Sequence, residues 1–446
     1  MFAQSRSVSA KVASSLGRRS IATVSELSPK VKLASVQNGS STASLTLVLK
    51  AGSRYESAVG AANVLKNFQF KSNKSSSALS IVRGTEQLGG VLSTTLTREH
   101  LFLTAEFLKG DEDFFLKMLS TTLFPKLQLH ELNESAVPIS AQEAVQVASS
   151  PSTLAVEYAH RRLFRSGLGN SLYVSNAEPV VLADVKALFN GAVQDEIALI
   201  GTGIEHETLK KLAEPYFGEE LSIALQEQAA ANKAGALPAV KTETFNGGEE
   251  RVAIDLHTLP EAKPSLVVAY GSAGAPSAEG LVIPHLLGSG SALKWSSGSA
   301  PLLEAASAVE GSTAQAFVQS YTDASVLAIV VEAEGSKRLT EVGKKVAEIV
   351  KQVSEGKVDK KTLDGAIARA KFELASKAET TVGAVELVAA EVFTGKVATL
   401  EQQFKALDAV TPASVAKAFK GFTKNKPAVV SVARLSQMAF ADELGF

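Results

Sequence analysis

The 446-residue chain contains no cysteine. Disulfide bonds, thiolate nucleophiles, cysteine-based zinc sites and thiolate-ligated iron–sulfur clusters are therefore excluded. The absence disfavours a secreted protein held together by disulfides, although it does not identify a compartment.

The sequence also has almost no surplus of charge and no long apolar run. Its formal net charge is −1, so no large positive field exists to attract a nucleic acid, and we expect no nucleic-acid partner. The best apolar runs, such as 45–49 and 326–331, have the length of strands, whereas spanning a bilayer takes about 18–20 residues. We therefore expect membrane association only through partner subunits.

Histidine pairs that could clamp a metal are missing as well. A pair at positions i and i+4 shares one helix face and is the simplest zinc clamp, but even the nearest two histidines here, His257 and His285, are many helical turns apart in the sequence. The composition and spacing therefore predict structural or surface roles for all six, with His100 solvent-exposed at the tip of a hairpin. These residues are His100, His130, His160, His206, His257 and His285.

Two glycine-rich segments, 201–207 and 288–294, lack the spacing of known phosphate-binding loops. The first has no third glycine of a dinucleotide fingerprint, and the second has no Gly-Lys-Ser/Thr ending. Both are expected to be structural turns.

The N-terminal segment 1–25 differs in composition from the rest of the chain. It contains Arg6, Lys11, Arg18 and Arg19, many Ser and Ala, and no acidic residue before Glu26. This composition predicts a mitochondrial transit peptide over 1–25, the alternative being a disordered polar tail.

Two pairs of segments indicate an internal duplication. Residues 48–60 and 268–280 each read as a strand, a turn of small residues, and a glycine that opens a helix, and 183–204 resembles 414–435 in the same order along the chain. Between them, 226–250 has the Ala-, Gly-, Lys- and Glu-rich composition of a linker. We predict homologous domains over 26–225 and 251–446.

Within each half the periodicity mixes strands and long helices. Residues 90–108 alternate around a turn near 98–100 and predict a β-hairpin, while 336–355 repeats apolar residues at helical spacing. The fold class predicted is α+β, built twice, each domain having a mostly antiparallel sheet packed with helices.

The order of elements in the first half resembles the pitrilysin-type (inverted zincin) metallopeptidase superfamily. The resemblance rests on the turn AGSRYE (51–56), Gly60 and the helix after it, LGG (88–90) and STTLTREH (93–100). In active members that helix carries His-x-x-Glu-His, in which two imidazoles bind zinc and the glutamate polarises water. Here the two histidine positions and the glutamate position of that motif are occupied by Asn63, Asn67 and Lys66, and these three positions are called the zinc frame below.

The resemblance also concerns residues outside that helix. It places the distal glutamate ligand of active members at Glu143, which would be a zinc ligand without the other ligands of the site. The alternative is that Glu143 is an ordinary solvent-exposed helix residue. Active members often carry an Arg and a Tyr in the second domain that grip the substrate backbone. The matching region, 299–330, keeps Tyr321 but has no arginine.

Two mitochondrial families of this superfamily lack the zinc motif. The first is the core protein 2 family of the cytochrome bc1 complex (complex III), which this chain resembles at 94–115, at 317–329 and in the tail MAFADEL at 438–444. The alternative is the alpha subunit family of the mitochondrial processing peptidase, which binds presequences with a long glycine-rich loop; the loop 286–303 here is short. An independently active metallopeptidase is a third alternative.

The resemblance to the core protein 2 family implies a non-catalytic subunit that supports assembly and stability of complex III on the matrix side of the inner membrane. Its implied partners are core protein 1, cytochrome b, cytochrome c1 and the iron–sulfur protein, in a dimeric complex. It also implies a clamshell of two domains, no cofactor, and no catalytic, cofactor-binding or metal-binding residue in this chain.

Overall fold

The structure is a computed structural model, in which the chain forms two compact units. The first contains Met1–Ala141, Leu172–Ala239 and Glu373–Lys405, and the second contains Gln142–Ser171, Val240–Phe372 and Ala406–Phe446. The expected transit peptide up to residue 21, His257 and most of the loop 286–303 lie outside the described residues. The structure describes residues 22–37, 39–174, 180–231, 235, 237–238, 244–254, 259, 261–274, 277–289, 300–356, 358–395 and 397–446.

The first unit is built on a six-stranded sheet in the order β1-β2-β6-β3-β5-β4. All its neighbouring strands are antiparallel except β2 and β6, which are parallel. The predicted hairpin is confirmed as β4 and β5. The strands are β1 (Thr23–Ser28), β2 (Val31–Val36), β3 (Thr42–Leu49), β4 (Val91–Leu96), β5 (Leu101–Leu108) and β6 (Ile197–Thr202).

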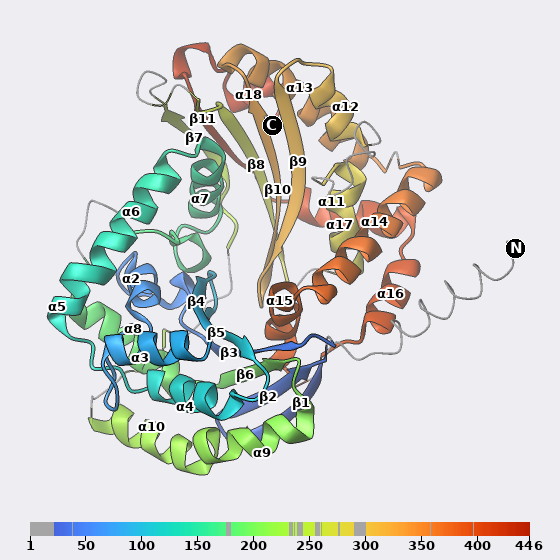
Figure 1. The fold of residues 1–446 in the computed structure, drawn as a ribbon. Coiled ribbons are helices and arrows are strands. Elements are labelled where there is room, and N and C mark those ends of the chain that lie inside the picture. Colours follow the sequence, from blue (N-terminus) through green and yellow to red (C-terminus); the bar gives the residue numbers. More distant parts are fainter. Residues whose placement is uncertain are drawn as a thin grey trace, which may run out of the picture. The chain divides into compact units, whose positions relative to one another are not determined.

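Helices cover both faces of this sheet (Figure 1). On one face α2, α4, α8 and α9 enclose an extensive apolar cluster, and on the other α15 packs against β2, β3 and β6. The helical segments are η1 (Ser53–Tyr55), α2 (Ala61–Phe68), α3 (Ala78–Gln87), α4 (Glu112–Thr122), α5 (Leu129–Glu131), the π-helical η2 (Leu132–Ala136), α8 (Leu182–Gln194), α9 (His206–Phe217), α10 (Glu219–Ala231), α15 (Thr381–Val392) and α16 (Leu400–Asp408), which extends into the second unit.

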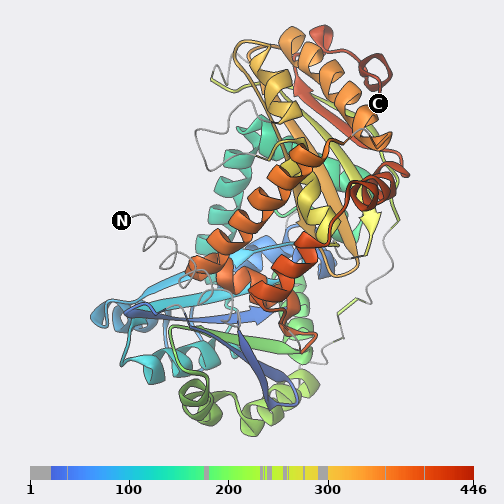
Figure 2. The same cartoon turned by 90° about the vertical axis from the view of Figure 1, so that its right-hand side faces the viewer.

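The second unit is built on a five-stranded sheet in the order β7-β11-β8-β10-β9. Helices α11, α13 and α17 pack on it, with α13 following the length of the sheet in Figure 2, and α7 packs against β8 and β11. The strands are β7 (Gly248–Ala253), β8 (Ser265–Ala273), β9 (Ser312–Ser320), β10 (Ala324–Ala333) and β11 (Ala428–Ala433). The helical segments are α7 (Pro151–Phe164), η3 (Gly167–Gly169), α11 (Ala278–Leu287), α12 (Pro301–Ser307), α13 (Ser336–Ser354), α17 (Pro412–Thr423), η5 (Leu435–Gln437) and α18 (Ala441–Leu444).

The two sheets share one topology, in agreement with the predicted duplication. In each, four strands are antiparallel neighbours and a fifth pairs in parallel with the end of that group: β2 with β6, and β7 with β11. Within the described residues, only the first sheet has a further strand, β1, beyond this parallel pair. The predicted α+β fold with mostly antiparallel sheets is confirmed.

Local sequence signals account for several elements. Thr411 caps α17 by accepting a hydrogen bond from the Ser414 N–H at 3.2 Å, and Pro412 is the first helical residue. The predicted helix over 336–355 is confirmed as α13, which buries Leu339, Val342, Val346 and Val350 of the predicted apolar pattern. Among the described residues, no helix is both long and apolar enough to cross a bilayer.

The compact units do not follow the sequence boundary drawn for the two domains. Three helices, α6 (Val137–Ala148), α14 (Lys360–Glu379) and α16, each carry the chain from one unit to the other. As a result α7, from the first half of the sequence, belongs to the second unit, and α15, from the second half, belongs to the first. Helix α10 also extends to Ala231, inside the segment predicted as a linker. The division into 26–225 and 251–446 stays a prediction about the duplicated halves.

Candidate functional site: the helix that carries the zinc frame

Helix α2 begins at a glycine that no other residue could replace without strain. Gly60 has a φ of 93°, and a Cβ there would lie 2.9 Å from the Cα of Val174. The Glu56 carboxylate lies just before it, and its Oε2 accepts hydrogen bonds from the N–H groups of Gly60 at 3.1 Å and Ala62 at 3.0 Å. These bonds satisfy two of the N–H groups that a helix start leaves open.

Burial controls the charge of Glu56. The residue is 7% exposed, and removal from water raises the pKa of its carboxyl from the usual 4.5 to about 8, although the backbone hydrogen bonds and the nearby Arg98 oppose this shift. Its second oxygen, Oε1, is buried and has no hydrogen-bond partner among the described residues. The side chain is therefore mostly protonated at neutral pH.

The residues of the zinc frame lie in the packed side of α2. Asn63 is 2% exposed, and Lys66 and Asn67 are half-buried. The Asn67 Nδ2 donates a hydrogen bond to the Ser140 Oγ at 2.9 Å, and the Ser140 hydroxyl donates to the Ala136 carbonyl at 2.8 Å. A frame position that would hold a histidine ligand in an active peptidase therefore joins two helices.

Helix α6, which carries Ser140, follows a π-helical segment directly. The segment Leu132–Ala136 packs against α2, so this irregular turn sets where α6 stands relative to the frame. Such π segments occur frequently at functional sites.

The hairpin tip at residues 97–100 is fixed to the turn that leads into α2. The Arg98 carbonyl accepts from the Arg54 N–H at 2.8 Å, and the Glu99 carbonyl accepts from the Gly52 N–H at 3.2 Å. Arg54 and Glu99 also form an ion pair of 2.6 Å between side chains only 3% and 8% exposed. A Cβ on Gly52 would lie 2.2 Å from the Arg98 carbonyl oxygen, so this close approach requires glycine.

The prediction that His100 is solvent-exposed is wrong. The residue is half-buried, and its ring stacks on that of Phe393 with 5.5 Å between centroids and 11° between planes. Burial, with the Lys50 ammonium adding to it, lowers the pKa of His100 from 6.5 to about 4. The aromatic partner comes from the end of α15, far away in the sequence.

The chemistry of the frame does not suit a metal ion. Carboxamides are poor zinc ligands, and an ammonium group at the position of the general base repels a cation. Over the described ranges, no group of three His, Cys, Asp or Glu residues comes close enough to hold a metal. Glu143 follows Ser140 on α6 and is half-buried. The structure thus joins α2 to α6 without assembling a ligand set.

The second unit shows where Tyr321 is engaged. Its hydroxyl lies 3.0 Å from the His160 Nε2 and 3.1 Å from the Gln319 Oε1. His160 is 1% exposed, and its Nδ1 lies 2.8 Å from the Val156 carbonyl, which can only accept, so this nitrogen carries a proton. The structural role predicted for His160 is confirmed, but nothing in the sequence indicated that it would bind Tyr321.

Comparison with known proteins places this scaffold in a family. Residues 32–176 match the family described as Insulinase (Peptidase family M16). A Cryptococcus neoformans protein named cytochrome b-c1 complex subunit 2, mitochondrial, is 38% identical over 442 residues, covering 99% of this chain and 98% of that protein.

Two more distant relatives carry the same name. The one from Neurospora crassa is 33% identical over 93% of this chain and 89% of its own length. The human one is 28% identical over 92% of this chain and 89% of its own length. Because the likeness to both fungal relatives covers nearly the whole of each chain, this chain belongs to the family of mitochondrial cytochrome b-c1 complex subunit 2.

Proposed function

We propose that this chain is a non-catalytic core subunit of the mitochondrial cytochrome b-c1 complex that supports the assembly and stability of the complex. In this role it is peripheral to the inner membrane on the matrix side. Its partners are core protein 1, cytochrome b, cytochrome c1 and the iron–sulfur protein, and they provide the attachment to the membrane. The near-complete alignment with relatives of that name supports the assignment.

One observation carries the non-catalytic part of the proposal. The helix α2, the turn before it and the hairpin tip form the surroundings of a peptidase site, yet the frame holds Asn63, Lys66 and Asn67. Lysine cannot accept a proton from water at neutral pH, and amides do not replace imidazole on zinc. This chain keeps the scaffold and has lost the groups that do the chemistry.

Migration of the native protein tests the proposal. Mitochondrial membranes solubilised in a mild detergent and run on a native gel should show the chain in one band with haem absorbance. Recovery instead in a soluble two-subunit peptidase without cytochromes would favour the processing-peptidase alpha subunit. Stoichiometric zinc in the purified chain, together with chelator-sensitive proteolysis, would contradict the non-catalytic assignment.

A further inference from the structure

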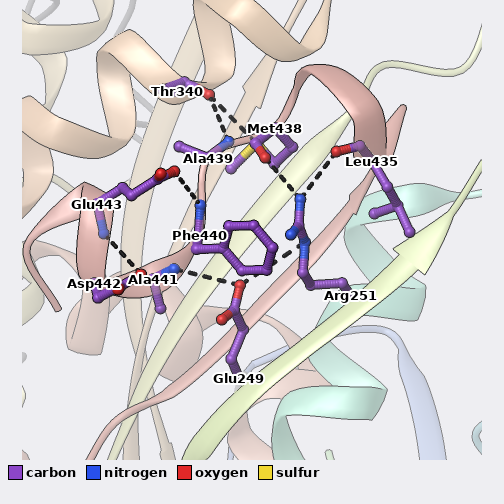
Figure 3. A network of polar contacts seen from close by, with 10 residues as sticks. All are labelled: Glu249, Arg251, Thr340, Leu435, Met438, Ala439, Phe440, Ala441, Asp442 and Glu443. Carbon is purple, nitrogen blue, oxygen red and sulfur yellow. Dashed lines mark hydrogen bonds and ion pairs between the residues drawn. The ribbon is translucent and has the colours of Figure 1, made fainter.

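The C-terminal segment 435–446, here called the C-terminal tail, contacts strand β7 through side chains of β7 and not through backbone pairing of two strands (Figure 3). The Arg251 Nη2 donates to the carbonyls of Leu435 at 2.9 Å and Met438 at 2.6 Å. The guanidinium carbon of Arg251 also lies 3.8 Å from the centroid of the Phe440 ring. A second link joins the Ala441 N–H to the Glu249 Oε1 at 3.3 Å.

Both faces of β7 are covered. Side chains at alternate positions of a strand point to opposite faces, so Glu249 and Arg251 meet the tail on one face. On the other face Glu250 pairs with Arg161 of α7, and Val252 packs against the apolar cluster that α7 shares with the sheet. These contacts are made by side chains on the two faces of β7 and do not involve the backbone groups on its outer edge.

That edge is open. Among the described residues β7 pairs only with β11, through bonds that include the Gly248 N–H to the Pro427 carbonyl at 2.7 Å and the Ile254 N–H to the Ala433 carbonyl at 3.2 Å. The backbone N–H and C=O groups of successive residues in a strand point to opposite sides. The groups of residues 248, 250, 252 and 254 therefore face β11, and those of the odd-numbered residues between them face away from it. Their N–H and C=O groups have no hydrogen-bond partner within the described part of the chain. They are Glu249, Arg251 and Ala253.

The duplicated fold shows what belongs at this position. In the first sheet the strand corresponding to β7 is β2, and its outer edge is occupied by the antiparallel strand β1. The second sheet has the same parallel pair but, over the described residues, no sixth strand. An unpaired edge of this kind is a template for a strand from another chain.

The described residues directly before β7 do not take the role that β1 has. The Asn246 N–H donates to the Leu163 carbonyl at the end of α7 at 2.9 Å, and Phe245 packs on Gly271 of β8. Strand β8 lies two strands inward from β7, so this segment crosses the face of the sheet rather than running along its edge.

The surroundings of the edge select the charge of an added strand. A hollow of about 450 Å³ opens over the start of β7 and of β11, between these two strands and the C-terminal residues 440–446. Three carboxylates, from Glu249, Asp442 and Glu443, line it together with the Lys426 ammonium group. The Glu249 carboxylate is also paired with the Arg251 guanidinium at 3.9 Å, and the Phe440 ring forms part of the apolar wall. Such a lining suits a lysine or arginine, whose stem packs on the ring while its cationic head meets the carboxylates.

We propose that the open edge of β7 binds an extended segment of a different subunit as an antiparallel sixth strand, with a lysine or arginine side chain in the hollow. The added strand repeats on the second sheet the arrangement of β1 on β2. The proposal rests on the proposed function, because the cytochrome b-c1 complex supplies the partner.

A site-directed crosslink tests the position and direction of the strand. The chain has no cysteine, so Ala253→Cys and Lys426→Cys each give one site for a photoreactive maleimide. In the purified complex both labels should reach one basic segment of another subunit. Because the strand is antiparallel, the label at 253 should contact residues earlier in the partner sequence than the label at 426. Adducts to a second copy of this chain, the reverse order, or adducts to unrelated segments would overturn the proposal.

Glu348→Cys, exposed on α13, is the control for the crosslink. Its label should not reach the same segment. If it does, the adducts report general proximity rather than a strand on β7, and the proposal fails.

A backbone substitution tests the edge without a label. Ala253→Pro removes an outward N–H but no bond of the β7–β11 ladder, so the isolated chain should keep its melting temperature. Loss of one interface hydrogen bond together with the clash of the ring should reduce its incorporation into the cytochrome-containing complex about tenfold. Ala253→Ser keeps the N–H and should assemble like the wild type.

The outcomes separate the two proposals. A stable Ala253→Pro chain that assembles like the wild type would overturn the strand proposal and leave the proposed function intact. A wild-type chain that does not migrate with cytochromes would instead refute the proposed function.

Discussion

Asn67 occupies a position at which an active peptidase of this superfamily carries a zinc-binding histidine. Its amide now donates to Ser140, and a hydrogen bond of this type contributes about 1 kcal/mol to stability. Lys66 and Asn63 complete the change from a metal frame to helix packing. At the residue scale, the proposal of a non-catalytic chain rests on three side chains of one helix.

Restoring the motif tests this account. The triple variant Asn63→His, Lys66→Glu and Asn67→His should bind zinc if Glu143 stands where the family resemblance places it, because two imidazoles and a carboxylate form a common zinc ligand set. Calorimetry against a chelator measures the affinity. Adding Glu143→Gln should weaken binding at least tenfold, whereas a triple variant with no zinc affinity would show that the frame or Glu143 is misplaced. Peptidase activity is not expected, since the region of Tyr321 lacks the arginine of active members.

Glu56→Gln should change how stability depends on pH. Burial raises the pKa of Glu56 from 4.5 to about 8, so the folded wild type holds this proton more tightly than the unfolded chain and loses stability as pH rises from 4.5 through 8. Glutamine keeps the acceptor for the N–H groups of Gly60 and Ala62 and does not ionise. The variant should match the wild type near pH 4 and exceed it at pH 7 by on the order of 3 kcal/mol.

Urea denaturation of both proteins at several pH values measures this difference. Subtracting the two curves removes the opposite effect of His100, whose lowered pKa makes the wild type lose stability as pH falls from 6.5 through 4. A constant difference across this range would contradict the burial of Glu56.

At the scale of elements, the sequence predicts those whose signals are local. The hairpin of β4 and β5 follows from alternation over 90–108, and α13 from apolar residues at helical spacing. The prediction for His100 fails because the residue follows Arg98 and Glu99 at the tip of the hairpin, while the ring that covers it belongs to Phe393, in the other half of the sequence. The tail MAFADEL is recognisable in the sequence as a motif, yet its partner Arg251 carries no signal of its own.

Arg251→Lys should release the tail from β7. Lysine has no planar guanidinium that can stack on the Phe440 ring while its Nη2 donates to both carbonyls, and hydrogen bonds to a charged group are worth about 1.5–3 kcal/mol. Limited proteolysis followed by mass analysis should detect faster cleavage after residue 434. Arg338→Lys, on α13, is the matched control, because its ion pair with Glu334 is exposed and should contribute little. Equal cleavage of both variants would show that Arg251 does not hold the tail.

At the scale of the whole molecule, the two halves of the sequence exchange helices. The first half contributes α7 to the second sheet, and the second half contributes α15 to the first. Local patterns cannot reveal this, because an amphipathic helix fits either sheet equally well by period and composition. The consequence is that a cut between the halves separates each sheet from one of its covering helices.

A fragment ending at residue 239 should therefore fail to fold alone. Without α15 it loses the cover of three valines, Val385, Val388 and Val392, each at most 5% exposed and each worth about 1.5–3 kcal/mol when buried. Their sum approaches the roughly 5–15 kcal/mol that stabilises a whole domain. Expressed alone, the fragment should be insoluble or bind a hydrophobic dye, and co-expression with residues 240–446 should recover a soluble pair.

A recombined chain provides the control for this experiment. It keeps residues 22–141 and 172–239, replaces α7 with a Gly/Ser linker and appends 373–405, so it contains the whole of the described first unit. This chain should unfold cooperatively in urea, because its sheet regains α15 and no longer carries a helix that belongs to the other sheet. A fragment 22–239 that unfolds with the same cooperativity would show that the exchanged helix is dispensable, and that the boundary predicted from the sequence, rather than the compact unit, is the folding boundary.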